Sequence, residues 1–206
     1  MHARDLDVDV ERVVTAIDVT SSAIVLGSAQ PESDVDVDAA ARLGVEIVRR
    51  RSGGGAVLLD PADPVWIDVE IGRGDPLWDD DVSRSMVWLG AVWVEALARL
   101  GLGGAVVHEG AMHGSPLARV VCFAGLAPGE VTVDGAKVVG ISQRRTRAGA
   151  RFQCAVPRRW SADRLIELLA PGLAATATTT LAGSIAVTTV DASADDVVGA
   201  FVQSLP

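Results

Sequence analysis

The one lysine of this sequence is its most informative side chain. Lysine and arginine together number 18, and all but Lys137 are arginines. This pattern indicates that position 137 requires a compact, rotatable ammonium, which a planar guanidinium cannot replace. Such a group suits catalysis or contact with an anion. The alternative is that a single lysine remained by chance.

A glycine-rich segment that follows a run of arginines is the second chemical feature. Three consecutive glycines allow positive φ angles and a close approach of the backbone to a ligand. Their amides can line an anion-binding concavity, and neighbouring arginines add forked donors for phosphate or carboxylate. The segment reads Arg49-Arg50-Arg51-Ser52-Gly53-Gly54-Gly55-Ala56-Val57.

Two cysteines, Cys122 and Cys154, form no disulfide framework and are expected to be free thiols. Both lie in apolar runs, so a buried structural role is the first interpretation and a nucleophile is the alternative. The three histidines have no metal-ligand spacing with the cysteines, and no zinc site is predicted.

The charge of the chain limits its partners. A formal net charge of −9 argues against nucleic acid. Arginines nevertheless gather at residues 49–51 and 144–151, which favours anion binding there, with a solvated surface as the alternative. No stretch approaches the roughly 18 apolar residues of a membrane span, and the N-terminus resembles no targeting segment. A cytoplasmic protein with no membrane partner is expected.

Hairpin-linked strands with segregated helices indicate an α+β fold with a mixed, mostly antiparallel sheet. The alternation of Val65 to Ile71 predicts a half-buried strand, and Asp134-Gly135 predicts a hairpin turn. Strands are also expected at 23–26, 46–48, 56–59, 105–107, 119–123, 130–133, 137–141 and 151–156. The length suits a single domain over residues 1–206.

Four helices are predicted. The longest runs from Asp79 to Leu100, with its first three aspartates at the N-terminus and Trp88 and Trp93 in the core. Asp34 is expected to cap a helix that ends at Gly44. The other two are expected at 161–169 and 193–202.

The order of these motifs resembles the lipoate–protein ligase A and octanoyltransferase family, which shares its catalytic domain with biotin–protein ligases. The glycine-rich segment matches the family motif R-R-x-S/T-G-G-G-A-V. Residues 135–145 match a second motif, G-x-K-(I/V)-x-G-(S/x)-(A/S)-Q-x-R, and Gly27 to Gln30 resemble an early G-x-x-Q loop. The resemblance covers residues from about 23 to 170.

The resemblance implies a biotin/lipoate protein ligase-like fold, related in architecture to class II aminoacyl-tRNA synthetases. It also implies that lipoate or octanoate is activated with ATP, accompanied by Mg²⁺, and transferred to a lysine of a lipoyl domain. Lys137 would contact the activated carboxylate and phosphate, and Arg50 would sit beside the phosphates. The residues expected to bind substrate and adenylate are Arg49, Arg50, Ser52, Gly53, Gly54, Gly55, Ala56, Asp60, Gly140 and Gln143.

Further expectations concern the acceptor and the departures from the family pattern. Leu59 and Cys154 stand where relatives have histidines. Full-length ligases often carry an additional C-terminal domain, so a separate accessory subunit is a candidate partner. Replacement of Lys137 by alanine is expected to abolish acyl transfer and leave the fold intact. The arginines expected to bind the acceptor domain are Arg144, Arg145, Arg147 and Arg151.

An ATP-independent octanoyltransferase is the alternative enzyme. A subgroup of the family has a pattern resembling C-F-x-A-P-S-x-Y-E, and Cys122, Phe123 and Glu130 match it in type and spacing. Cys122 would then take octanoyl from acyl carrier protein and pass it to the lipoyl-domain lysine without a cofactor. That subgroup tends toward G-G-R where this chain has Gly53 to Gly55, which favours the ligase. A third hypothesis is a non-catalytic module that binds a lipoyl domain or a small carboxylate.

Overall fold

A six-stranded antiparallel sheet forms the centre of the molecule. The computed structural model describes residues 12–61, 63–180 and 186–206. Each pair of neighbouring strands in this sheet is antiparallel. The predicted hairpin is confirmed, because Asp134 and Gly135 have the positive φ angles that such a turn requires, 50° and 79°. The strands, in spatial order, are β1 (Val13–Ile17), β5 (Val65–Gly72), β11 (Gly149–Val156), β10 (Ala136–Arg145), β9 (Val131–Val133) and β6 (Ala105–Val107).

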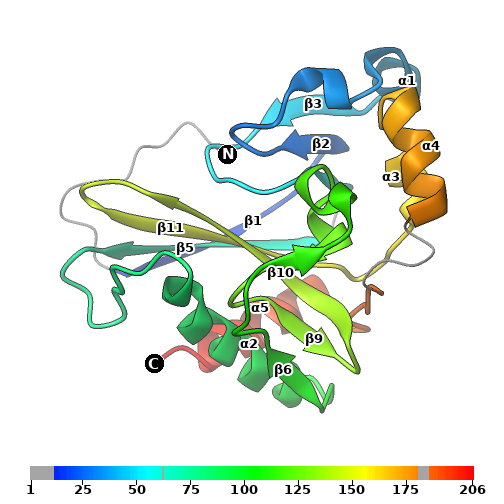
Figure 1. Ribbon diagram of the computed structural model, residues 1–206. Coiled ribbons are helices and arrows are strands. Elements are labelled where there is room, and N and C mark those ends of the chain that lie inside the picture. The colour runs from blue at the N-terminus through cyan, green and yellow to red at the C-terminus, as the bar shows by residue number, and fades with distance from the viewer. Residues whose placement is uncertain (1–11, 62, 181–185) are drawn as a thin grey trace.

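A smaller sheet lies above the large one in Figure 1. Its central strand β2 (Ala23–Leu26) pairs in parallel with β3 (Glu46–Arg49) and antiparallel with β4 (Val57–Leu59). The glycine-rich segment connects β3 to β4, so both of its ends are anchored in this sheet. A short pair, β7 (His113–Gly114) with β8 (Gly125–Leu126), lies in the segment before β9.

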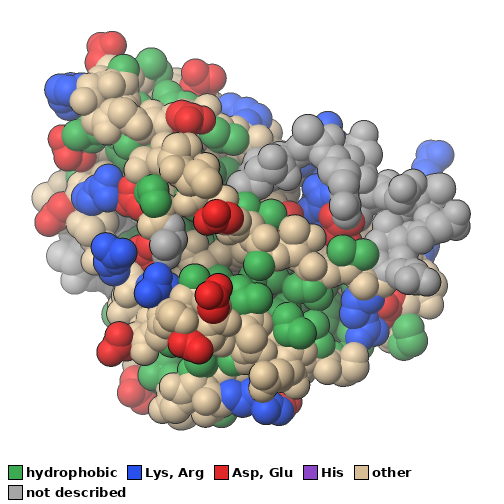
Figure 2. All heavy atoms as spheres, turned by 180° about the vertical axis from the view of Figure 1, so that it is seen from behind, with side chains coloured by type: hydrophobic (Ala, Val, Ile, Leu, Met, Phe, Trp, Pro, Cys, Tyr) green, Lys and Arg blue, Asp and Glu red, His purple; other side chains and the backbone are tan. Residues whose placement is uncertain are grey.

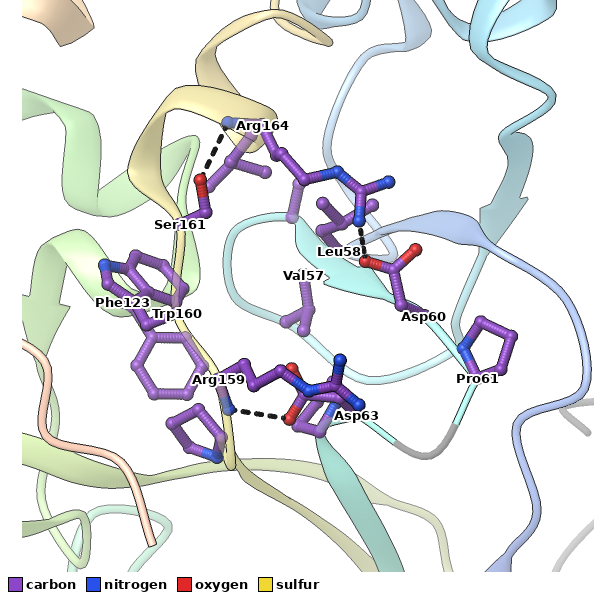
Figure 3. A pocket seen from close by; sticks show the side chains of 14 residues that line it. Val57, Leu58, Asp60, Pro61, Asp63, Phe123, Arg159, Trp160, Ser161 and Arg164 are labelled. Carbon is purple, nitrogen blue, oxygen red and sulfur yellow. Dashed lines mark hydrogen bonds and ion pairs between the residues drawn. The ribbon is translucent and has the colours of Figure 1, made fainter. Parts of the chain in front are cut away.

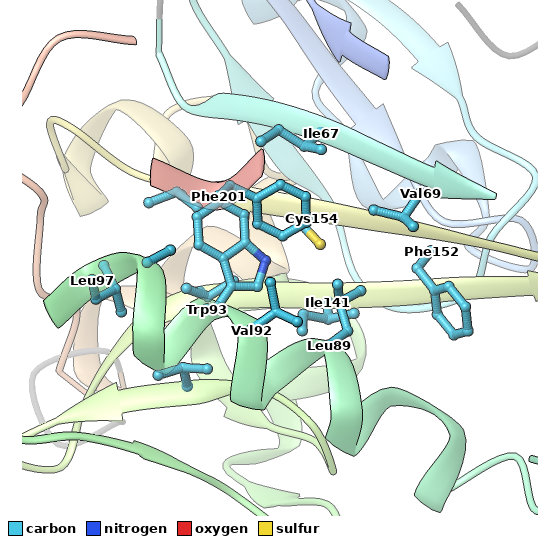
Figure 4. Close-up of a cluster of buried hydrophobic side chains, with 14 of the residues drawn as sticks. Ile67, Val69, Leu89, Val92, Trp93, Leu97, Ile141, Phe152, Cys154 and Phe201 are labelled. Atoms are coloured by element: carbon cyan, nitrogen blue, oxygen red, sulfur yellow. The ribbon is translucent and has the colours of Figure 1, made fainter. Parts of the chain in front are cut away.

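Two helices cover one face of the large sheet, as Figure 4 shows. They are α2 (Val87–Arg99) and α5 (Ala194–Gln203). Trp93 of α2 is fully buried, with its ring centroid 4.5 Å from that of Phe201. The predicted place of Trp93 in the core is thus confirmed. The remaining α-helices are α1 (Val37–Leu43), α3 (Ala162–Ile166) and α4 (Pro171–Thr180), which lie beside the small sheet in Figure 1.

The longest helix begins later than predicted. Instead of starting at Asp79, α2 starts at Val87, after the 3-10 helix η2 (Arg84–Met86). The carboxylate of Asp79 accepts from the amide of Asp81, and that of Asp81 accepts from the amide of Ser83, each at 2.8 Å. These side chains form local turns that compete with helical hydrogen bonding, so they do not cap the helix.

Other local predictions are also corrected. The run 119–123 is no continuous strand. It spans the end of the 3-10 helix η3 (Pro116–Arg119) and the start of the 3-10 helix η4 (Cys122–Ala124), with an isolated β-bridge from Val121 to Ala56 between them. Apolar composition alone does not distinguish a strand from a buried turn. The cap of α1 is Asp36, which accepts from the amide of Ala39 at 2.9 Å, and not Asp34. The 3-10 helix η1 (Glu32–Asp34) precedes α1.

The prediction of a half-buried β5 is wrong, because all eight residues of this strand are buried. Its second face carries polar side chains that bond to β11. The amide of Gln153 donates to Asp68 at 3.0 Å, and Arg151 forms an ion pair with Glu70 at 2.7 Å. The indole of Trp66 also donates to Asp68, at 2.8 Å. A polar face is tolerated inside the molecule because its groups satisfy one another.

These features confirm the predicted α+β class with a mostly antiparallel sheet. Within the part of the chain that the structure describes, no helix is long and apolar enough to cross a membrane. On the face shown in Figure 2, acidic and basic side chains are interspersed around an apolar area.

The buried carboxyl of Asp68 leads to a prediction for the variant Asp68→Asn. Burial raises the pKa of Asp68, and the hydrogen bonds from Gln153 and Trp66 lower it by less. The folded state therefore holds this proton more tightly than the unfolded state does. Wild-type protein should lose stability, relative to the variant, as the pH rises above the ordinary carboxyl value of about 4. Urea unfolding of both proteins from about pH 3.5, near the ordinary carboxyl pKa, to about pH 7 measures the difference between their free energies of unfolding. A wild-type stability that stays constant or rises with pH, relative to that of the variant, contradicts the prediction.

Candidate active site

Lys137 is buried near the start of β10, with 1% of its surface exposed. Its Nζ lies 2.7 Å from Oε2 of Glu130 and donates to the carbonyl oxygens of Cys122 and Gly125, each at 2.9 Å. The three N–H groups of the ammonium thus have three oxygen partners. The structure holds the lysine as a fixed positive charge inside the molecule, whereas a freely rotatable group was expected.

Glu130 is the site residue that the sequence analysis left out of its candidates. Its Oε2 accepts from the amide of Ala127 at 2.7 Å, and its Oε1 accepts from the amide of Ile141 at 3.1 Å. Glu130 thus accepts from two backbone amides and lies beside the ammonium of Lys137. The only sequence signal was the spacing of Cys122, Phe123 and Glu130, which matched the transferase pattern.

Cys122 presents its thiol beside the lysine. Its Sγ lies 3.9 Å from Nζ of Lys137, and the side chain is only partly buried. A Cβ added at Gly140 would lie 3.3 Å from this sulfur, so the glycine of the second motif leaves room for the thiol. Because the ammonium is close and fixed, it stabilises negative charge that develops on the sulfur.

Arg50 is buried and holds the glycine-rich segment in place by hydrogen bonds. Its guanidinium donates to the carbonyl oxygens of Gly53 and Gly55, at 2.7 and 2.8 Å, and to that of Val25 at 3.0 Å. Burial lowers the pKa of Arg50, and interaction with the nearby Cys122 raises it by less. A contact between Arg50 and phosphates stays a prediction, since these donors are already used by the backbone.

The glycine-rich segment contacts the turn that carries Cys122. The amide of Cys122 donates to the carbonyl of Ala56 at 3.1 Å. A Cβ added at Gly55 would lie 2.6 Å from the amide nitrogen of Val121, and one added at Gly27 would lie 1.9 Å from the carbonyl oxygen of Gly54. Only glycine fits at these two positions, so Gly55 and Gly27 serve the close packing of these loops.

Ser52 connects the same segment to the polar face of the large sheet. Its buried hydroxyl donates to Oε1 of Gln153 at 2.6 Å and lies 3.0 Å from the hydroxyl of Ser142. Since Gln153 in turn bonds Asp68, the glycine-rich segment is held by a chain of buried hydrogen bonds. The contact predicted between Ser52 and substrate stays a prediction.

Arg49 and Gln143 lie in other bonding networks. Arg49 donates to the carbonyl of Gly27 at 3.0 Å and to that of Gln30, which fixes the early G-x-x-Q loop. Gln143 donates to the carbonyl of Val82 at 2.7 Å and accepts from the hydroxyl of Ser85 at 3.1 Å. Gln143 therefore joins β10 to the segment before α2, and its contact with substrate stays a prediction.

The arginines expected to bind the acceptor do not form one surface. Arg151 is only 4% exposed and pairs with Glu70, so it lies inside the polar face of the sheet and not in a surface cluster. Arg145 stacks 4.1 Å above the ring of Trp78 and donates to the carbonyls of the Asp79–Asp80 turn. Arg144 is half-buried, and Arg147 is exposed at the β10–β11 turn. The acceptor role stays a prediction, and the burial of Arg151 argues against its share in it.

The two residues that replace family histidines are both buried. Leu59 packs in the core between the two sheets, and Cys154 packs against the opposite face, among the residues of Figure 4. Burial raises the pKa of the Cys154 thiol to about 12. Cys154 is therefore a structural residue, as the sequence predicted, and cannot act as a nucleophile at neutral pH.

A cavity of about 250 Å³ lies next to the site, shown in Figure 3. Val57, Phe123 and Trp160 line it, and Asp60 stands at its edge in an ion pair with Arg164. The ring of Phe123 lies 5.0 Å from Nζ of Lys137 and 5.2 Å from the ring of Trp160. One wall of the cavity is thus also a wall of the lysine site.

Comparison with known proteins places this geometry in a family. Residues 8–203 match the family described as the lipoyl protein ligase A/B catalytic domain. A curated relative, octanoyltransferase LipM of Clostridioides difficile (strain 630), is 28% identical over 114 residues, which are 55% of this chain and 41% of the relative. The matched part is thus less than half of that relative's length.

Solved structures share the fold. A putative lipoate protein ligase from T. acidophilum with bound lipoic acid has a TM-score of 0.70 at 20% identity, covering 95% of this chain and 71% of its own. Lipoate-protein ligase A bound with ATP also has a TM-score of 0.70 at 20% identity, covering 97% and 73%. The family match spans nearly the whole sequence, and this chain belongs to the lipoyl protein ligase A/B catalytic domain family.

Proposed function

We propose that this chain transfers an octanoyl-type acyl group from a thioester donor to a lysine of a lipoyl domain, through a thioester on Cys122. The observation that carries the proposal is the partly exposed sulfur, 3.9 Å from a buried ammonium that Glu130 holds in place. The similarity to an octanoyltransferase supports it.

The first half-reaction forms the acyl-enzyme. The thiolate of Cys122 attacks the carbonyl carbon of the donor thioester, and the electron pair moves to the carbonyl oxygen. When the carbonyl re-forms, the carbon–sulfur bond of the donor breaks, and the donor thiol takes up the proton that Cys122 released. Lys137 acts as a fixed charge that stabilises the thiolate, because its protons are already bonded to Glu130 and two carbonyls.

The second half-reaction releases the product. The neutral amine of the lipoyl-domain lysine attacks the acyl carbon of the Cys122 thioester. An amide bond forms and the carbon–sulfur bond to the enzyme breaks. The proton that the amine loses is taken up by the thiolate of Cys122 or by water. Acyl carrier protein is the proposed donor and the lipoyl domain the proposed acceptor.

An ATP-dependent lipoate–protein ligase is the second candidate. The sequence Gly53 to Gly55 favours it, because the cysteine subgroup tends toward G-G-R. Lipoate or octanoate would then be activated as an adenylate, and a separate accessory subunit is a candidate partner. Among the described residues no three His, Cys, Asp or Glu side chains come together as a metal site, so Mg²⁺ would arrive with the phosphates of ATP.

The variant Cys122→Ser separates the two enzymes. Wild-type protein incubated with octanoyl–acyl carrier protein should gain one octanoyl group on Cys122 and pass it to a lipoyl domain. The variant should do neither, since its hydroxyl is a much weaker nucleophile than a thiolate. Intact-mass spectrometry of both proteins measures the transfer. Cys154→Ala is the matched control and should retain transfer, because its buried thiol is inert.

Other outcomes of the same assay identify the alternatives. Modification of the lipoyl domain only with ATP and a free acid, with release of pyrophosphate and full activity in Cys122→Ser, supports the ligase and contradicts the proposal. Stabilisation by a lipoyl domain or carboxylate without either reaction supports the binding module.

The buried ion pair leads to a prediction for Lys137→Met. Removal of one partner of a buried pair costs about 3–5 kcal/mol, because the other charge stays buried. The expectation that replacement of Lys137 leaves the fold intact stays a prediction, and a loss of stability is now expected with it. The double variant Lys137→Met/Glu130→Gln should recover much of the free energy of unfolding. Both variants should lack acyl transfer, since neither has the ammonium.

Two measurements check this prediction. Urea unfolding compares the stability of the two variants, and intact-mass spectrometry follows formation of the Cys122 thioester. Wild-type activity in the double variant would show that the charge of Lys137 serves the fold alone.

A further inference from the structure

We propose that the cavity beside Phe123 is the entry channel for a phosphopantetheine-type arm, and that Arg159 and Arg164 bind the phosphate at its outer end. The inference rests on the proposed cysteine transferase and identifies where its donor binds. Four observations carry it: the position of the cavity, its apolar inner wall, its charged mouth and the bonding of the acidic residues there.

The inner end of the cavity adjoins the thiol. Ala56 and Phe123 line the cavity, and the amide of Cys122 donates to the carbonyl of Ala56. A Cβ added at Gly140 would lie 3.3 Å from Sγ of Cys122 and 3.5 Å from Cζ of Phe123, so sulfur and ring meet over the same glycine. The Phe123 ring therefore lies beside both the cavity and the sulfur.

The lining changes from apolar to charged toward solvent. The buried side chains of Val57, Phe123 and Leu165 form the inner wall. At the outside, the side chains of Arg164 and Asp60 are 53% and 25% exposed, and Arg159 is exposed as well. Figure 3 shows Arg159 and Arg164 extending from the segment before and within α3 toward the opposite wall.

This gradient matches the chemistry of one class of donor. A phosphopantetheine arm has its thioester at one end, a chain of methylene and amide groups in the middle, and a phosphate at the other end. The thioester would lie toward Cys122, and the chain would fill a space of about 250 Å³. Guanidinium groups bind phosphate oxygens with charge-assisted, often paired hydrogen bonds, which suits Arg159 and Arg164.

The acidic residues at the mouth do not prevent phosphate binding. Asp63 accepts from the backbone amides of Arg158 and Arg159, at 2.7 and 3.2 Å, so its oxygen is turned to the backbone. Asp60 accepts from the hydroxyl of Ser22 as well as from Arg164. An exposed ion pair of this kind contributes about 0–1 kcal/mol, so a phosphate can compete for the guanidinium.

The decisive experiment compares two donors that differ only in the phosphate, octanoyl-phosphopantetheine and octanoyl-pantetheine. The ratio of their kcat/KM values for acylation of Cys122 is measured in wild-type protein, Arg159→Ala, Arg164→Ala and the double variant. In wild-type protein kcat/KM should be about tenfold or more higher for the phosphorylated donor, because a hydrogen bond to a charged group contributes a factor of this size. The ratio should fall in each single variant and approach one in the double variant.

Two control variants separate the phosphate contact from general effects. Arg42→Ala removes an exposed cation from α1, outside the cavity lining, and should keep the wild-type ratio. Asp60→Asn breaks the same ion pair as Arg164→Ala but leaves the cation. Its ratio should be at least that of wild-type protein, because the guanidinium is then available to the phosphate.

The outcomes separate this proposal from the one on which it rests. A ratio near one in wild-type protein, or a ratio unchanged in the double variant, overturns the channel while the Cys122 thioester still forms. Failure of every thioester donor to acylate Cys122 overturns the transferase itself. Octanoyl-coenzyme A and octanoyl–acyl carrier protein, run in parallel, identify the source of the arm. The kcat/KM for acylation of Cys122 by each of these two donors should be lower in the double variant, because both donors carry the phosphate.

Discussion

The buried ion pair between Lys137 and Glu130 is the interaction on which the site depends. An ammonium with 1% of its surface exposed is tolerated only where opposite charge and hydrogen-bond acceptors surround it. Here those acceptors come from Glu130 and from the carbonyls of Cys122 and Gly125. The need to satisfy one charge thus brings β10, the η4 turn and the start of β8 together. The thiol of Cys122 takes its place as a consequence of this arrangement.

A second buried cation extends the arrangement to the small sheet. Arg50 uses its guanidinium to hold the carbonyls of Gly53 and Gly55, and Cys122 bonds to Ala56 directly after this segment. Lys137 of β10 lies beside the sulfur, Arg50 directly after β3 interacts with it electrostatically, and both cations are held by backbone oxygens. In this chain the motif residues Lys137 and Arg50 hold the backbone of the site in place by hydrogen bonds. The thiol, the glycine-rich backbone and the cavity beyond Phe123 are the parts of this region at which we propose that substrate binds.

The two faces of the large sheet explain why adjacent residues of β11 have opposite roles. Side chains of neighbouring residues in a strand point to opposite faces. Cys154 consequently packs in the apolar core against α2 and α5, where its thiol is inert. Gln153, one residue earlier, lies on the polar face and connects Ser52 to Asp68.

The sequence alone determined the α+β class, the Asp134-Gly135 hairpin and the family, because periodicity, turn chemistry and ordered motifs are local properties of the chain. It did not determine the counterion of Lys137, the turn at Cys122 or the burial of Arg151 with Glu70. Each of these depends on groups far apart in sequence. A side chain's charge can be read from its letter, but its partner and its burial are decided only when the two sheets pack together.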